Sequence, residues 1–216
     1  MEKKEIDFAA IPQTAVKVLT SPATFFREMP KTGGFVEPLV FLVALGIVTA
    51  IVDGVLGILG LKFFLSVWAA FFSIIVTSVV AAIGGFIVAA VLFILWKVLG
   101  SQESYETAYR CVAYLAALWP VMAVANAIPY IGALISILLM TYFCVTASVE
   151  THKVPSQKAW TVFGILGAAA LLISIGAGIA TKTFQKGTEQ QLREMQKGSE
   201  EMQKKLEEMQ KRMPKQ

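Results

Sequence analysis

The sequence contains very little charge along most of its length. Asp53 is the only charged residue within residues 38–61, and residues 63–96, 111–149 and 159–181 contain none. A helix at the surface of a water-soluble core keeps one polar face, so runs of this length exclude an ordinary soluble domain. They are typical of membrane spans, because a hydrocarbon core ~30 Å thick needs about 20 helical residues. The sequence therefore predicts an all-α protein, a polytopic bundle of transmembrane helices.

Histidine and cysteine are also scarce, which argues against most catalytic and metal-binding sites. His152 is the only histidine, and no second histidine or cysteine cluster stands at metal-ligand spacing from it. No glycine-rich loop ends in Lys-Ser or Lys-Thr, so nothing indicates nucleotide hydrolysis. Cys111 and Cys144 fall inside apolar runs, where we expect them to behave as small hydrophobic residues. We therefore expect no enzymatic activity, no cofactor and no metal.

A cleavable signal peptide is not visible either. The first ten residues are charged, and the first long apolar run begins near Phe35, too late and too long for the apolar part of a signal peptide. We expect the first span to act as an uncleaved signal. The net charge of +4 arises mainly in residues 182–216, an excess that suits an acidic lipid surface but not nucleic acid.

The uncharged runs divide the chain into three regions. A polar segment, residues 1–34, precedes a membrane domain, residues 35–181, and a charged tail, residues 182–216, follows. The membrane domain is expected to contain five spans, at approximately 35–61, 64–97, 108–127, 129–149 and 159–181.

Two of the runs are too long for one conventional span. Residues 111–149 would extend ~58 Å as a single helix, so this run must fold back. Residues 63–96 would extend ~51 Å, which is long for one span yet barely enough for two. One tilted helix there gives five spans, whereas a hairpin at Gly84-Gly85 gives six. The fold-back of the longer run is marked by Asn126, Pro129, Tyr130 and Gly132.

Lysine and arginine counts bear on orientation but not on the number of spans. With the N-terminus inside, the inner segments carry nine of these residues and the outer segments five, in the five-span and six-span arrangements alike. We therefore expect a cytoplasmic N-terminus in a multi-pass membrane protein. The side of the membrane that holds the tail stays open on these counts.

The polar segment is expected to contain an amphipathic helix that packs at the membrane surface. Ser21 and Pro22 match the N-cap and the first position of a helix. Phe25, Phe26 and Met29 then supply an apolar side.

The tail carries the only internal repeat, in which Glu-Met-Gln-Lys occurs three times at a spacing of seven residues. This spacing predicts a heptad-like helix, although Gly198 and Ser199 weaken it as a coiled coil. The helix either lies against lipid or solvent, or associates with a second copy or a partner helix. The candidate residues for association are Leu192, Met195, Met202, Leu206 and Met209.

Ionisable residues inside a span cost about 2.5–3.5 kcal/mol at its centre, so they are candidates for function. A polar cluster is expected in the outer half of the membrane, formed by Asp53, Asn126 and Lys62. Ion pairs are expected near the inner face, formed by Glu37, Lys97 and Arg110. These residues suit helix packing, an ion pathway, or a site for a partner or lipid headgroup. We favour packing, because glycines that allow close helix contact recur along the spans.

Small and aromatic residues form a pattern that extends over two passages of the sequence. The first runs from Val18 to Met29 and is followed by Gly33-Gly34. The second begins with residues 104–110 and continues through Tyr114, Pro120 and residues 128–132 to His152. Over roughly residues 16–182 this pattern resembles the Yip family of membrane proteins, which interact with Ypt/Rab GTPases, and in particular its prokaryotic branch.

The resemblance implies a five-helix membrane bundle with a cytosolic N-terminus and no shared catalytic residues. The eukaryotic members of this family are associated with vesicle trafficking and membrane shaping, so the resemblance implies a related role. We therefore expect a non-enzymatic module of interaction or membrane organisation, whose partners are the lipid bilayer and either another protein or a second copy. The alternative is a small ion or solute transporter that uses Asp53 and Asn126.

Overall fold

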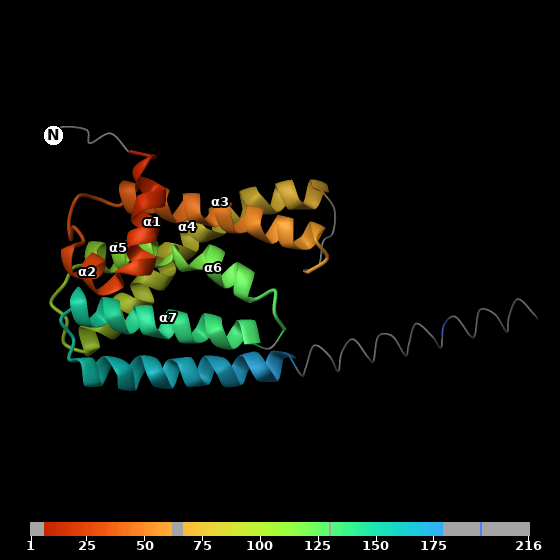
Figure 1. Ribbon diagram of the computed structural model, residues 1–216. Helices are drawn as coiled ribbons and strands as arrows, with labels where there is room; N and C mark the ends of the chain where they lie inside the picture. The colour runs from red at the N-terminus through yellow and green to blue at the C-terminus, as the bar shows by residue number, and fades with distance from the viewer. Residues whose placement is uncertain (1–6, 62–66, 130, 179–194, 196–216) are drawn as a thin grey trace, which may run out of the picture. The chain divides into compact units, whose positions relative to one another are not determined.

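The protein is helical throughout the part of the chain that the computed structural model describes, residues 7–61, 67–129, 131–178 and 195 (Figure 1). Residues 1–171 form one compact unit and residues 172–216 another. The helices are α1 (Ala10–Thr20), α2 (Pro22–Glu28), α3 (Val36–Ile58), α4 (Val67–Val98), α5 (Tyr105–Leu115), α6 (Leu118–Ala125) and α7 (Ile131–Glu150). A further helix, Ser156–Gly178, follows α7.

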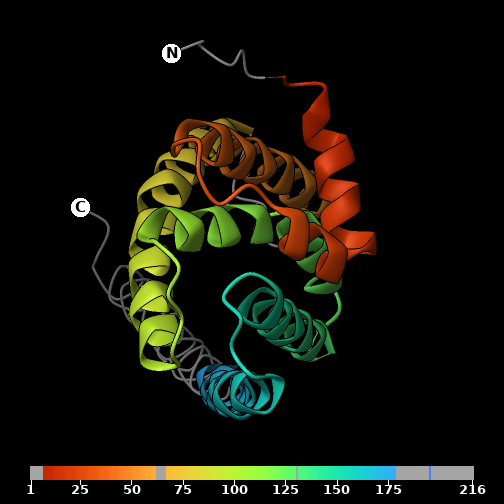
Figure 2. The same cartoon turned by 90° about the vertical axis from the view of Figure 1, so that its left-hand side faces the viewer.

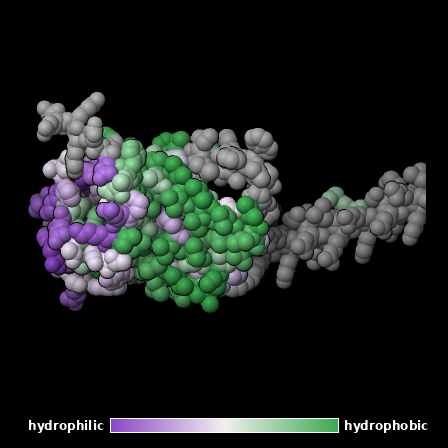
Figure 3. All heavy atoms as spheres, turned by 45° about the horizontal axis from the view of Figure 1, so that its top comes forward, coloured by the Kyte–Doolittle hydropathy of each residue, from purple (hydrophilic) through white to green (hydrophobic). Residues whose placement is uncertain are grey.

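Five helical segments are long and apolar enough to cross a membrane. They are Val36–Ile58, Val76–Val98, Tyr105–Ala125, Ile131–Glu150 and Ser156–Gly178. The predicted class, an all-α bundle with five membrane-capable helices, is confirmed. Figure 3 shows hydrophilic residues gathered at one end of the bundle and hydrophobic residues over the helices beyond it.

The ambiguous run forms one helix, α4, which continues through Gly84 and Gly85 without a hairpin. Gly85 has a packing role instead. A methyl group in its place would lie 2.8 Å from Cδ1 of Leu42, so the absent side chain allows α3 and α4 to pack closely. This continuity supports the five-span arrangement over the six-span alternative.

The third membrane-capable segment is not one regular helix, which the sequence analysis did not anticipate. It breaks between α5 and α6 at Ala116 and Ala117. Pro120 has no N–H to donate to the carbonyl of Ala116, and the N–H of Trp119 bonds that carbonyl instead, at 3.0 Å. The N–H groups of Ala116 and Ala117 likewise bond carbonyls three residues earlier in place of four. The segment bends there as a result.

The fold-back between α6 and α7 lies where Asn126, Pro129 and Gly132 predicted it. The N–H of Gly132 donates to the carbonyl of Ile128 at 3.0 Å. A methyl group on Gly132 would overlap the backbone carbonyl of Ala125. Glycine is therefore what lets α7 begin directly against the end of α6.

The helix α5 lies at the centre of this unit, and nine of its eleven residues are buried. Figure 2 looks onto the polar end and shows α5 between α3 and α7, with α4 along one side. At this end α2 packs against α7, and the Phe25 and Tyr114 rings meet edge to face with their centroids 5.0 Å apart. The expected helix after Ser21 is therefore present, and its apolar side is buried in the bundle. The sequence analysis did not name α1 as a helix.

Candidate functional site at the polar end

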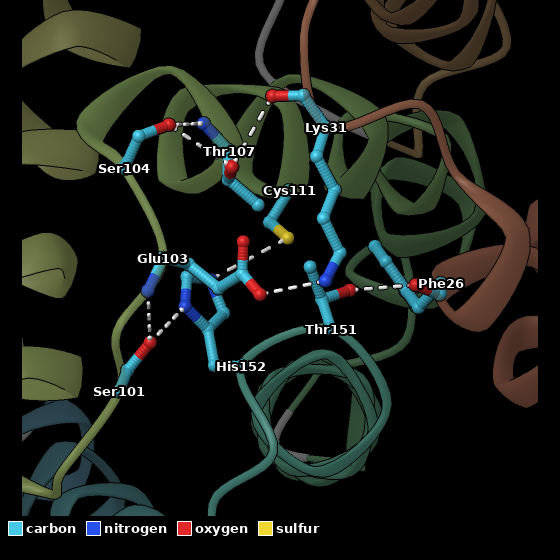
Figure 4. A network of polar contacts seen from close by, with 9 residues as sticks. All are labelled: Phe26, Lys31, Ser101, Glu103, Ser104, Thr107, Cys111, Thr151 and His152. Atoms are coloured by element: carbon cyan, nitrogen blue, oxygen red, sulfur yellow. Dashed lines mark hydrogen bonds and ion pairs between the residues drawn. The ribbon is translucent and has the colours of Figure 1, made fainter.

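Buried and partly buried polar side chains collect where the segment after α2, the linker before α5, α5 itself and the linker after α7 meet (Figure 4). We call this set the polar hub. Its members are Lys31, Ser101, Glu103, Ser104, Thr107, Cys111, Thr151 and His152. They come from segments far apart in the sequence, and their contacts tie these segments together.

His152 lies at the centre of the polar hub and is 2% exposed. Its Nδ1 is 2.9 Å from Oγ of Ser101, and its Nε2 is 3.7 Å from Sγ of Cys111. Its ring stacks on Trp96, with centroids 3.8 Å apart and planes at 18°. Burial, followed by the nearby charges of Lys31 and Lys97, lowers the pKa of His152 to about 3. The imidazole is therefore neutral at physiological pH.

A direct link between α4 and α7 lies beside the histidine. Nε1 of Trp96 donates to Oγ of Ser148 at 2.7 Å, and that hydroxyl donates to the carbonyl of Cys144 at 2.6 Å. Trp96 and Ser148 are both fully buried. Each donor in this chain is satisfied, as a buried polar group requires.

Two further contacts attach the N-terminal segment to the polar hub. Nζ of Lys31 lies 2.6 Å from Oε1 of Glu103, and Oγ1 of Thr107 donates to the carbonyl of Lys31 at 3.2 Å. The hydroxyl of Thr151 donates to the carbonyl of Phe26 at 2.7 Å. Together these bonds fasten α2 and the linker after it to α5 and to the end of α7.

Arg110 fixes the glycine pair Gly33-Gly34, which lies between α2 and α3. Its side chain is 1% exposed, Nη2 donates to the carbonyl of Gly34 at 2.9 Å, and Nε lies 3.5 Å from Oε1 of Glu106. The same carboxylate accepts the N–H of Gly34 at 2.6 Å. Gly33 has a φ of +122°, and a methyl group there would lie 2.9 Å from Nη2 of Arg110. This tight, left-handed turn explains the glycine pair that carried part of the family resemblance.

A family model described as Yip1 domain matches residues 16–178. The chain belongs to the Yip1 domain family. No curated protein and no solved structure matched it. The Yip1 domain begins within α1, contains all of the polar hub, and ends with the helix Ser156–Gly178. With its five apolar helices, the chain is a multi-pass membrane protein of this family.

The three residues predicted at the inner face lie at the polar end of the Yip1 domain. Glu37 is in the first turn of α3, Lys97 is in the last turn of α4, and Arg110 is within α5. Arg110 pairs with Glu106, which the sequence analysis did not name, and the ion pairs among Glu37, Lys97 and Arg110 stay a prediction. The ammonium of Lys97 lies over the Phe93 ring, 5.5 Å from its centroid.

The predicted outer cluster is only partly within the described residues. Asp53 is half-buried near the end of α3. Asn126 is exposed at the end of α6, and its Oδ1 accepts a hydrogen bond from Oγ of Ser136 at 3.2 Å. Lys62 lies outside the described residues. The cluster of Asp53, Asn126 and Lys62 therefore stays a prediction.

The predicted association surface of the tail also lies largely outside the described residues. Met195 is helical and 64% exposed. The other four residues, Leu192, Met202, Leu206 and Met209, lie outside the described residues, so association through the tail stays a prediction.

Sequence reasoning missed most of the polar hub. It treated His152 as a loop residue and did not mention Ser101, Glu103 or Thr151. One local signal was available, because Ser104 precedes a helix and its hydroxyl accepts the N–H of Thr107 at 3.2 Å, as an N-cap does. The other contacts join residues 41 to 125 positions apart, and no local pattern reveals such pairs.

The polar hub combines buried neutral groups around His152 with one partly exposed ion pair, Lys31–Glu103. The contact between Cys111 and His152 has the residue types of a nucleophile and its base, but both side chains are buried and the imidazole resists protonation. Within the described ranges, no group of three or more His, Cys, Asp or Glu residues could hold a metal ion. The arrangement is best suited to holding the helix ends in one geometry.

Proposed function

We propose that this protein acts as a non-enzymatic membrane module whose polar end presents a rigid docking surface to a protein partner. The observation that carries this proposal is that the polar groups of the hub bond to one another. Lys31 forms an ion pair with Glu103, and Thr151 donates to the carbonyl of Phe26. His152 is hydrogen-bonded to Ser101. These bonds join separate segments and hold α2 and the linker after it in a fixed position, and α1 packs against α2 and α5.

The exposed surface above the polar hub has the composition of a docking site. On α1, Gln13, Val16 and Lys17 are exposed, and Val16 is 58% exposed although it is apolar. A rigid surface with apolar and polar residues side by side is what a protein partner can bind at little cost in ordering. We place this surface in the cytoplasm because Lys and Arg predominate in the segments on that side. We place the protein in a prokaryotic plasma membrane because its sequence resembles the prokaryotic branch of the family.

The rival function, transport of an ion or solute through Asp53 and Asn126, has less support. The large cavity among the described helices is lined almost entirely by apolar side chains. An ion crossing the membrane needs a succession of polar groups that replace its hydration shell. The cavity offers no such succession.

The proposal is tested by site-specific photo-crosslinking in intact cells that express the full chain. A photoreactive amino acid is placed at Gln13 or at Val16 on α1, and the matched control position is Ile94, which is 62% exposed on α4 within a membrane span. We expect one and the same protein to crosslink from both α1 positions and not from Ile94.

Two results would contradict the proposal. One is the absence of any protein crosslink from the α1 positions at normal expression. The other is ion or solute flux in vesicles containing the purified protein, if Asp53→Ala abolishes that flux.

A further inference from the structure

An apolar groove of about 650 Å³ opens on one side of the bundle. Its walls are formed by α4, by α5 and α6, by α7, and by residues 163–170 of the helix that follows. Along α4 the described lining residues run from Thr77 to Leu92, while Trp119, Cys144 and Phe163 lie on the facing walls. The groove lies within four of the five membrane-capable segments, so the medium it opens to is lipid.

The groove is closed at the polar end. Just beyond Leu92, the indole of Trp96 bonds Ser148 at 2.7 Å and stacks on His152, which joins α4 to α7. These side chains are buried, so nothing enters from the polar end. An occupant has to come from the side or from the opposite face of the membrane.

The groove lies at the middle of the bundle's apolar depth. Its lining runs from Ile137 to Cys144 on α7 and from Phe163 to Ala170 on the last helix, ~11 Å on each at 1.5 Å per residue. Both stretches are centred on their helices, Ile131–Glu150 and Ser156–Gly178. The groove therefore lies around the midplane of a ~30 Å hydrocarbon core, where the acyl chains of each leaflet end.

The volume of the groove argues against a helix as the occupant. One helical turn about 10 Å across and about 5.4 Å long fills ~420 Å³, so the groove holds between one and two turns. A helix that crosses the membrane has more than five turns. A volume of this size is instead within the range that small apolar ligands occupy.

We propose that the groove binds one acyl chain of a bilayer phospholipid. Gly84 makes room for this chain, because a methyl group added there would meet no protein atom within 4 Å. Left empty, the apolar walls would lose their dispersion contacts on one side. Close packing against fixed walls, not escape from water, is what retains a chain inside a bilayer. This inference does not depend on the proposed docking function.

The test uses the purified full chain in vesicles of phosphatidylethanolamine and phosphatidylglycerol. The vesicles contain a small fraction of phospholipid with a photoreactive diazirine in the middle of one acyl chain, and crosslinked peptides are identified by mass spectrometry. We expect crosslinks at groove residues such as Val88 and Met140 to exceed those at Ile173 by at least about threefold. Ile173 is 72% exposed and does not line the groove.

A matched pair of variants separates groove binding from general lipid contact. Gly84→Leu places a side chain in the groove. Gly54→Leu, on α3, is the control, because Gly54 is also half-buried, also has no atom within 4 Å of an added methyl group, and does not line the groove. We expect Gly84→Leu to remove most of the groove crosslinks, and Gly54→Leu to retain them. Thermal unfolding confirms that both variants are folded.

A second readout uses the native cysteines, which are the only two in the sequence. Cys144 lines the groove, whereas Cys111 lies beneath His152. We expect a membrane-permeant maleimide to label Cys144 in delipidated detergent solution, and added phospholipid to slow this labelling by at least about fivefold.

Three results would overturn the inference. The first is a set of crosslinks spread evenly over all lipid-facing residues. The second is groove crosslinking that a folded Gly84→Leu variant leaves unchanged. The third is crosslinking of groove residues to a second copy of the chain in place of lipid.

Discussion

At the scale of single residues, the polar end depends on buried polar groups that bond to other segments of the chain. Arg110 shows the contrast with the surface. It is 1% exposed and holds Glu106 and the carbonyl of Gly34, whereas the Lys17–Glu28 pair, at 3.1 Å, has side chains 52% and 60% exposed. Exposed pairs contribute about 0–1 kcal/mol, while removing one member of a buried pair costs about 3–5 kcal/mol. The geometry at Gly33 and Gly34 thus rests on Arg110.

The buried histidine makes a prediction about pH. In the unfolded chain His152 takes up a proton near pH 6.5, whereas in the folded protein its pKa is about 3. Below pH 6.5 the unfolded state therefore binds more protons, and the folded state loses stability as the pH falls toward 3. We expect His152→Gln to reduce this loss, because glutamine does not titrate. Thermal unfolding of the purified protein between pH 7.5 and pH 4.5 measures both slopes.

The control for this prediction is a second neutral substitution at an exposed position, Gln157→Ala in the helix after α7, which should keep the wild-type slope. Carboxylates also titrate in this range, but they are common to all three proteins and cancel in the comparison. Equal slopes for wild type and His152→Gln would show that His152 is protonated in the folded protein.

At the scale of elements, the sequence predicted those features that depend on length and on local chemistry. Five membrane-capable helices followed from the uncharged runs, and Gly132 correctly marked the fold-back between α6 and α7. The break between α5 and α6 has a local cause in Pro120, which is visible in the sequence but was not used. The polar hub was out of reach because its bonds join α2, α5 and the end of α7 across long separations.

Glycine positions within the helices lead to a prediction about packing. We expect Gly132→Ala to destabilise the protein by ~3 kcal/mol, because the added methyl group would overlap the backbone of Ala125, which cannot move aside as a side chain can. Gly54→Ala is the matched control, and there the methyl group meets nothing. It should be neutral or stabilising by up to about 1 kcal/mol, since alanine favours a helix over glycine. Unfolding in mixed detergent micelles measures the difference, and equal stability of the two variants would refute the clash.

At the scale of the whole molecule, a polar end and an apolar band define how the Yip1 domain can enter a bilayer. The helices α1 and α2 and the polar hub occupy one end, and exposed apolar side chains cover the spans beyond it. Because α4 is one continuous helix, the number of membrane-capable helices among the described residues is odd. The charge counts could not decide this, since they were the same for five and six spans, whereas the family resemblance implied five.

An odd number of crossings predicts that the two ends of the chain lie on opposite sides of the membrane. Reporters fused before Met1 and after Gln216 test this, because alkaline phosphatase is active only outside the cytoplasm and green fluorescent protein folds well only inside it. We expect fluorescence from the N-terminal fusion and phosphatase activity from the C-terminal fusion, as the excess of Lys and Arg around α1 and α2 indicates. Fluorescence from both ends would require an even number of crossings, so at least one of the five apolar helices would not span the membrane. The opposite pair of signals would keep the five crossings, reverse the orientation, and move the proposed docking surface of α1 out of the cytoplasm.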